Sequence, residues 1–377
     1  MKILFISMPS IHAIRWIENL KNTDFELYWF DVTNRGTITT LDRVTQFVNW
    51  KTRKKPYIKG EYIFSKKFPN AYFRIKHLFE VSENEFLENI IQEFQPDIIH
   101  SLEMQHCSYP ILKTMNKYPN IKWIYSCWGS DLYYYKNIKN HNIKIKSVLK
   151  RVDYLITDCE RDANLAKELG FTGKHLGVIP GGSGYNLEQL EAYKLPSIER
   201  KLILVKGYQH TFGRALNVIK ALTELKVELS SFEIVVFGAH NDVLDYIEAH
   251  NLPFKTYHRN ELSQDELMQI MGKALIYIGN SISDGMSNTL LEAIVMNAFP
   301  VQSNPGNVTS EIINNTENGI LIQNPDNIEE IKKAIINAIN DKARIIEAAK
   351  INADIAKERL DYRNIQSKII QLYNQLL

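Results

Sequence analysis

The strongest constraint on the fold of this chain is an alternation of short apolar runs with longer amphipathic stretches, repeated from its start to about residue 303. In the first half, strand-like runs fall at residues 2–7, 26–32, 97–100, 123–127, 154–158 and 178–180. In the second half they fall at residues 202–207, 233–238, 274–279 and 299–303, with helix-like stretches between them. Strands that alternate with helices predict parallel sheets covered by helices on both faces.

The chain length of 377 residues predicts two such α/β domains with a cleft between them. The sequence GGSG at 181–184 and the polar stretch after it mark a boundary. We therefore predict an N-terminal domain over residues 1–195 and a C-terminal domain over residues 200–357. The tail is helical, and we expect its last amphipathic segment, about 358–377, to pack back on the N-terminal domain.

Composition limits the compartment and the partners. The chain is 45% hydrophobic and 23% charged, as in folded soluble proteins, and no apolar run has transmembrane length. A net charge of +2 without a clustered basic helix argues against nucleic acid binding. Cys107, Cys127 and Cys159 are widely spaced and lack a CxxC or zinc pattern, so we expect no disulfide framework and no metal site. A cytoplasmic location fits these features.

The segment 51–77 is unusually basic and aromatic. It carries nine Lys and Arg residues against a single acid, Glu61. Six aromatic residues are interleaved with them: Tyr57, Tyr62, Phe64, Phe68, Tyr72 and Phe73. This mixture suits peripheral contact with the anionic inner face of a cell membrane. The alternative is a solvated surface whose aromatic side chains belong to the core.

The most informative stretch is SISDGMSNTLLEAIVMNAFPVQS at residues 281–303. A strand ends at Gly279 and a helix begins near Asn288, which places the intervening loop at the carboxyl edge of a parallel sheet. Ligands bind at that edge, and the first helical N–H groups attract phosphate. We predict that Asp284 and Glu292 flank a nucleotide sugar there. The predicted donor contacts are Gly285, Met286, Ser287, Asn288, Thr289 and Leu290, the last three through their amides.

The same stretch, as DGMSNTLLEAIVMNAFPV, resembles the paired-acid motif EGxxxxxLEAxxxGxPV of glycosyltransferase family 4. It departs from the motif in having Asp284 in place of the first Glu and Asn297 near the usual Gly. The resemblance implies a GT-B architecture, two facing Rossmann-like domains with the donor on the C-terminal one and the acceptor on the N-terminal one. It also implies retention of anomeric configuration, same-face attack and no metal or other cofactor. Without this resemblance, the interpretation would be that Asp284 caps the helix and that Glu292 is a solvated acid on it.

The stretch 202–222 resembles the first C-terminal strand, turn and helix of the family, which bring two cations to the diphosphate. Here Tyr208 and Phe212 stand in their places. We predict that Lys206 and Arg214 replace them, because a diphosphate leaving without a metal needs cationic neutralisation. The remaining donor-side residues predicted from the resemblance are Gly207, Gly238 and Arg259.

On the acceptor side, Trp128 takes the place of a family histidine in the turn CWGSD at 127–131. The acceptor-side candidates are His12, Arg15, Glu103, His106, Trp128 and Asp131. The alternative for each is a side chain satisfied within the core.

We therefore predict a metal-independent, retaining hexosyl- or N-acetylhexosaminyltransferase of bacterial polysaccharide type. Its donor is a UDP-, GDP- or ADP-sugar, and its acceptor is a glycan or a lipid-linked sugar. One alternative is a nucleotide-sugar epimerase of the same architecture. The other, favoured by the missing cations at Tyr208 and Phe212, is a non-catalytic subunit that binds a sugar nucleotide or glycan.

Overall fold

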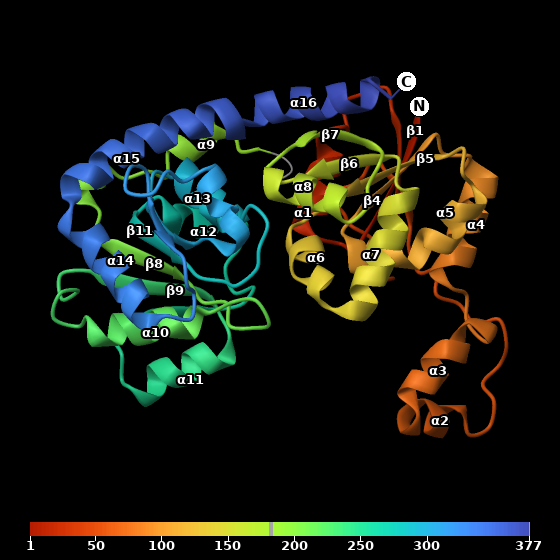
Figure 1. Ribbon diagram of the computed structural model, residues 1–377, viewed down its shortest axis with the longest axis horizontal. Helices are drawn as coiled ribbons and strands as arrows, with labels where there is room; N and C mark the ends of the chain where they lie inside the picture. Colours follow the sequence, from red (N-terminus) through yellow and green to blue (C-terminus); the bar gives the residue numbers. More distant parts are fainter. Residues whose placement is uncertain (181–183, 377) are drawn as a thin grey trace.

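The computed structural model describes residues 1–180 and 184–376, and it consists of two bodies, each built on one parallel β-sheet (Figure 1). The predicted fold class, two doubly wound α/β domains, is confirmed. The glycine-rich turn expected at residues 181–184 lies outside the described residues except for its last member.

The N-terminal sheet has seven strands in the order β3-β2-β1-β4-β5-β6-β7, all paired in parallel. They are β1 (Lys2–Ser7), β2 (Glu26–Asp31), β3 (Thr45–Phe47), β4 (Ile98–Leu102), β5 (Lys122–Ser126), β6 (Tyr154–Thr157) and β7 (Lys174–Val178). The central strands are buried on both faces, so their sequences are continuous apolar runs. The strand expected at residues 178–180 lies earlier, as β7, because this half-exposed edge strand carries little hydrophobic pattern.

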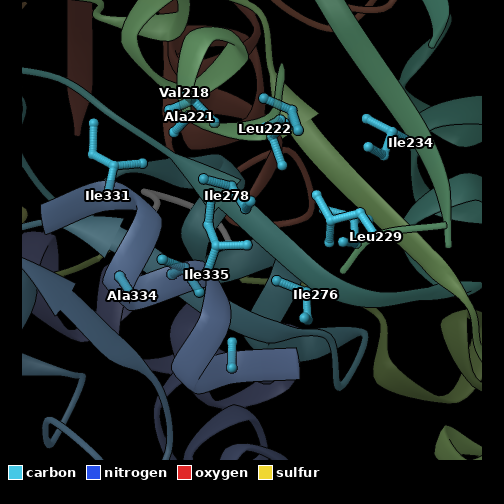
Figure 2. Close-up of a cluster of buried hydrophobic side chains, with 14 of the residues drawn as sticks. Val218, Ala221, Leu222, Leu229, Ile234, Ile276, Ile278, Ile331, Ala334 and Ile335 are labelled. Atoms are coloured by element: carbon cyan, nitrogen blue, oxygen red, sulfur yellow. The ribbon is translucent and has the colours of Figure 1, made fainter. Parts of the chain in front are cut away.

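The C-terminal sheet has six parallel strands in the order β10-β9-β8-β11-β12-β13. They are β8 (Leu202–Lys206), β9 (Glu233–Ala239), β10 (Lys255–His258), β11 (Ala274–Gly279), β12 (Phe299–Ser303) and β13 (Ile320–Ile322). Figure 2 shows the core on one face of this sheet, where α10 (Ala215–Glu224) and α14 (Ile328–Asn340) meet the strands. Val218 and Leu222 lie one helical turn apart on α10, so both reach this core.

The other helices cover the two sheets. In the N-terminal half they are α1 (Ile11–Glu18), α4 (Glu83–Phe94), α5 (Leu112–Lys117), α6 (Ser130–Tyr133), α7 (Lys139–Arg151) and α8 (Glu160–Glu168). In the C-terminal half they are α9 (Leu187–Glu191), α11 (Asn241–Ala249), α12 (Gln264–Met271) and α13 (Asn288–Val295).

The C-terminal helices form a strap that joins the domains. α15 (Lys342–Ile355) lies on the C-terminal domain, and after a short π-helical turn α16 (Tyr362–Asn374) runs across to the N-terminal one (Figure 1). On α16, Tyr373 is fully buried against β1. Its hydroxyl accepts a hydrogen bond from Trp16 Nε1 at 2.8 Å and lies 2.6 Å from His100 Nδ1. The chain therefore crosses between the domains twice.

The basic aromatic segment is an arm. α2 (Glu61–Lys67) and α3 (Pro69–Ile75) extend away from the N-terminal sheet (Figure 1). The side chains of Tyr57, Tyr62 and Phe68 are 78%, 71% and 49% exposed, so the interpretation that they belong to the core is wrong. Across the described residues, no helix combines the length and the apolar character needed to span a bilayer.

Candidate active site

A cavity lies where the first turn of α13 faces the N-terminal domain. From the C-terminal domain, its walls include seven of the predicted residues: Lys206, Gly238, Asp284, Ser287, Asn288, Thr289 and Glu292. His12 and Arg15 on α1 close it from the N-terminal domain. The structure thus brings the predicted paired acids and Lys206 together with the beginning of α13.

Lys206 is the cation at the centre of this cavity. It ends β8, and its Nζ lies 4.0 Å from Asp284 Oδ2 and 3.5 Å from Ser287 Oγ. Burial raises the pKa of Asp284, while the nearby Lys206 charge opposes that rise. Asp284 also accepts a hydrogen bond from the Gly285 N–H at 3.0 Å. The carboxylate is therefore held in place beside a cation at the helix start.

Glu292 is buried, at 3% exposure, so the interpretation as a solvated helical acid is wrong. Its Oε1 accepts a hydrogen bond from Gln264 Nε2 at 2.8 Å. Its Oε2 is buried and has no hydrogen-bond partner among the described residues. Burial raises the pKa of this carboxyl. A buried polar oxygen without a partner is costly, and a hydroxyl group of a ligand in the cavity would satisfy it.

The beginning of α13 offers fewer amides than expected. The backbone carbonyl of Ser287 accepts from the N–H groups of Leu290 and Leu291, each at 3.1 Å. Leu290 is therefore not a free donor, and its side chain is fully buried in the core, which corrects that prediction. Asn288 and Thr289 line the cavity, and as the first residues of α13 their N–H groups have no acceptor within the helix.

The prediction for Arg214 is also corrected. Its Nε donates to Asp326 Oδ1 at 3.0 Å, and its Nη1 donates to the backbone carbonyl of Gly213 at 2.9 Å. The guanidinium is thereby directed toward the loop before α14 and not among the walls of the cavity. Arg15, predicted on the acceptor side, lines this cavity instead, where its charge opposes the rise in the pKa of Glu292 that burial causes.

The predicted glycines serve close packing. A Cβ on Gly238, which has a φ of 61°, would lie 2.5 Å from the Tyr208 ring, and one on Gly207 would lie 2.7 Å from the Ala239 Cα. Gly238 thus lets Tyr208 lie against the strand end in the cavity wall. Arg259 lies at the rim, with its guanidinium 5.4 Å from the centre of the Tyr208 ring.

A second cavity adjoins the first and shares three of its walls, namely His12, Asp284 and Asn288. Trp128 and Met286, both predicted site residues, line it as well. Asn288 Nδ2 lies 3.1 Å from His12 Nδ1, across the domain boundary. Burial, with the charges of Arg15 and Lys206, lowers the pKa of His12 to about 4, so this imidazole is neutral at physiological pH.

Three acceptor-side predictions are corrected, because Glu103, His106 and Asp131 belong to neither cavity wall. Glu103 accepts hydrogen bonds from the N–H groups of Gln105 and His106 and caps the following helical turn. His106 is exposed and lies 3.4 Å from the Glu103 carboxylate. Asp131 is buried and accepts from the Tyr125 hydroxyl at 2.7 Å and the Trp128 N–H at 3.0 Å. Glu103 and Asp131 therefore stabilise the conformation of their own loops by accepting backbone hydrogen bonds.

The two domains touch along one side of the second cavity. Gly129 has a φ of 89°, and a Cβ there would lie 2.1 Å from the Gly285 Cα. Beside this contact, Ser130 Oγ lies 2.9 Å from Ser283 Oγ. Arg161 Nη2 donates to the backbone carbonyl of Asp284 at 2.7 Å. The two domains contact each other through backbone atoms here. We call the contact between residues 129–130 and residues 283–285 the seam.

Sequence reasoning missed two residues. Asp158 follows β6 at the carboxyl edge of the N-terminal sheet and lines the second cavity. It is the last residue of a predicted strand, and that position was the available signal. Gln264 opens α12 behind a Ser263–Glu266 capping box and reaches Glu292 from there. No local pattern indicates that contact.

Comparison with known proteins describes the two halves separately. Residues 2–159 match the family described as glycosyl transferase 4-like, and residues 191–357 match the glycosyl transferases group 1. No curated protein sequence matches the chain.

Solved structures share the arrangement over essentially the whole chain. Sucrose-phosphate synthase from Thermosynechococcus elongatus is 16% identical with a TM-score of 0.72, over 100% of this chain and 99% of that one. HepE from Anabaena in complex with UDP-glucose is 14% identical with a TM-score of 0.68, over 100% of both chains. The E. coli structure described as trehalose-6-phosphate bound with UDP-2-fluoro glucose is 12% identical with a TM-score of 0.69, over 100% of both. At these identities the similarity shows a common fold.

Proposed function

We propose that this chain, a glycosyltransferase of GT-B fold with a glycosyl transferase 4-like half and a group 1 half, moves a sugar from a nucleotide diphosphate sugar to an acceptor. The transferred sugar is a hexosyl or N-acetylhexosaminyl group. The acceptor is a hydroxyl group of a glycan or of a lipid-linked molecule. One observation carries the proposal: Lys206, Asp284 and Glu292 converge on the free amides at the start of α13. A helix start beside a cation is a phosphate site.

Each group has a role in this proposal. Lys206 and Arg15 neutralise the diphosphate, assisted by the amides of Asn288 and Thr289. Asp284 lines both cavities and so holds hydroxyl groups of the transferred sugar. Glu292 lines only the first cavity, and its buried Oε2 accepts from the ribose.

We further propose retention by same-face attack without a metal. The bond between the anomeric carbon and the leaving phosphate oxygen breaks, and the acceptor oxygen bonds to the same face of that carbon. The acceptor proton passes to the leaving phosphate oxygen. Lys206 supports this route because its cation lies where negative charge develops on the phosphate. Among the described residues, the one metal-type cluster, Asp158, Cys159 and Asp162, already has Arg161 on the Asp162 carboxylate.

Thermal unfolding with UDP-, GDP- and ADP-sugars tests the donor site. One of these donors, at hundredfold excess over its dissociation constant, should stabilise the protein by about 2.7 kcal/mol. Lys206→Met and Asp284→Asn should abolish most of this stabilisation, while Arg214→Gln, which removes a cation outside the cavity, should preserve it. Stabilisation by none of the donors would refute the proposal.

Product analysis tests the reaction itself. Transfer should persist in EDTA, and the anomeric configuration of the product, read by NMR, should equal that of the donor. An isomerised donor formed without any acceptor would instead identify an epimerase. Donor binding without release of free nucleotide, with or without acceptor, would identify a binding subunit.

We propose that residues 51–77 hold the protein on an anionic membrane surface, where a lipid-linked acceptor resides. Arg53 forms two 2.9 Å hydrogen bonds to Glu61, which pins the base of the arm. Lys66 and Lys67 on α2 are exposed and so can face lipid headgroups. Basic residues near an anionic surface contribute about 1 kcal/mol each, and exposed aromatic side chains suit the headgroup layer.

Vesicle sedimentation tests the membrane contact. Wild-type protein should bind phosphatidylserine vesicles, bind less at high salt, and not bind phosphatidylcholine vesicles. The double variant Lys66→Glu, Lys67→Glu should weaken binding at least tenfold. The matched variant Lys226→Glu, Lys273→Glu reverses two exposed charges of the C-terminal domain and should bind as wild type. Equal losses in both variants would refute a role of the arm.

A further inference from the structure

The two adjoining cavities differ in charge. Lys206 and Arg15 line the first, which takes the diphosphate in the proposed function. Among the described residues that line the second cavity, none is Lys or Arg, while two are acids, Asp158 and Asp284. The guanidinium of Arg161, which donates to the backbone carbonyl of Asp284, is engaged by the Asp162 carboxylate and the backbone carbonyls of residues 284 and 305. A phosphorylated ligand in the second cavity would therefore lack a countercharge.

Asp158 and Asn288 each bring to this cavity a buried side-chain oxygen that has no hydrogen-bond partner among the described residues, and Asp158 is the one on the N-terminal side. Its Oδ2 accepts a hydrogen bond from the Met286 N–H at 3.1 Å, across the domain boundary. Its Oδ1 is buried and has no hydrogen-bond partner among the described residues. A Cβ on Gly285 would lie 2.2 Å from the carboxylate, so only a glycine fits behind it. The carboxylate is thus fixed against the loop that carries Asp284, with one oxygen left over for a donor.

Most of the other side chains that line this cavity are apolar. Trp128 is half-buried beside His12, with their ring centres 5.6 Å apart. The apolar lining on the N-terminal side also includes Trp16, Leu102, Ile156 and Ile179, and the neutral hydroxyl groups of Ser126 and Thr157 lie among them. An indole wall opposite a hydrogen-bond acceptor is complementary to a sugar ring, which has C–H groups on its faces and hydroxyl groups around its edge.

We propose that the second cavity is the acceptor subsite and that it takes an uncharged sugar ring, with one hydroxyl group donating to Asp158 Oδ1 and one face against Trp128. This inference rests on the proposed function and adds the chemical class of the acceptor. Because Asp284 separates this cavity from the donor cavity, the bound ring lies beside the transferred sugar. A phosphate or lipid carried by a longer acceptor lies outside the cavity.

The test uses the full chain and the nucleotide sugar that gives thermal stabilisation, and it measures nucleotide release. The probes are methyl glycosides of glucose, galactose, mannose and N-acetylglucosamine, compared with glucose 6-phosphate and fructose 6-phosphate. At least one methyl glycoside should raise release above the rate with water alone, and the sugar phosphates should not.

In Asp158→Asn, the KM for that glycoside should rise at least about tenfold, since the buried carboxyl oxygen that accepts from the sugar hydroxyl is replaced in a site with no room for rearrangement. Nucleotide affinity should stay within twofold of wild type, because the groups proposed to hold the nucleotide line the first cavity and Asp158 does not. Trp128→Ala should likewise raise the KM for that glycoside and leave nucleotide affinity unchanged, because the contact between the indole and the sugar ring is lost. Glu160→Gln, an exposed acid two residues from Asp158, should behave as wild type.

Sugar phosphates that are used as well as the glycosides, or an unchanged glycoside KM in both variants, would overturn the inference while the donor chemistry stands. Release that no glycoside raises above the water rate would overturn it too. A protein that no nucleotide sugar stabilises would instead show that the proposed function is wrong.

Discussion

Substitution of Gly129 by alanine should separate the closing of the two domains from their folding. The added Cβ would lie 2.1 Å from the Gly285 Cα, whereas ordinary contacts begin at 3.4 Å. The difference, 3.4 − 2.1 = 1.3 Å, must be taken up by backbone on both sides, because no flexible side chain lies between them. The seam therefore opens by about 1 Å.

An opening of this size should lower transfer about a hundredfold, since misplacement of reacting groups by about 1 Å typically costs that much. Donor affinity should change little, because most walls of the donor cavity belong to the C-terminal domain. The assay is kcat/KM for transfer, together with thermal stabilisation by the donor.

Gly170→Ala is the matched control. Gly170 also has a positive φ, of 101°, but nothing lies within 4 Å of a Cβ placed there. Both variants carry backbone strain of about 1–3 kcal/mol, and only one carries the seam contact. Equal loss of transfer in the two variants would refute the reasoning, because strain alone would then explain the effect.

Three further predictions concern buried polar groups. Glu292→Gln should raise the melting temperature of the ligand-free protein, because it removes a buried charge, yet weaken donor binding in the same thermal assay; a lower melting temperature would contradict this. Burial raises the pKa of Asp131 to about 7, above its unfolded value near 4, so the folded chain holds a proton that the unfolded chain has lost. Its contribution to stability should therefore fall as pH rises from about 4 to 7, by up to about 1.4 kcal/mol per unit, and urea titrations of Asp131→Asn should lack this slope. Tyr373→Phe leaves Trp16 Nε1 and His100 Nδ1 without a partner and should cost roughly 3 kcal/mol in urea unfolding; a loss below about 0.5 kcal/mol would contradict a role in holding α16.

The sequence predicted what local patterns determine. The loop from Asp284 and the helix that carries Glu292 follow directly from a strand end and helix-forming residues, and the structure places both carboxylates at one cavity. Lys206 was predictable because alternate residues of a strand point to the same side.

Side-chain directions set by distant segments were not predictable. Arg214 adjoins the right turn, but Asp326, more than a hundred residues later, draws its guanidinium away. Arg15 was predicted at the cleft, but its place beside Lys206 depends on how the domains close on each other, and no local pattern encodes that closure. Asp131 was predicted as a site residue because the turn at 127–131 resembles an acceptor-side loop of the family, yet its carboxylate accepts hydrogen bonds from Tyr125 and Trp128 close by.

The strap has a consequence for biosynthesis. Because α16 fills the core beside β1, the N-terminal domain lacks a helix that is translated only after the C-terminal domain. Domains usually fold in the order of their synthesis, but here the earlier one stays incomplete, with apolar surface uncovered, until the later one has been made. A nascent chain stalled before residue 362 should therefore be bound by chaperones and cut readily by proteases, and emergence of residues 362–376 should end both.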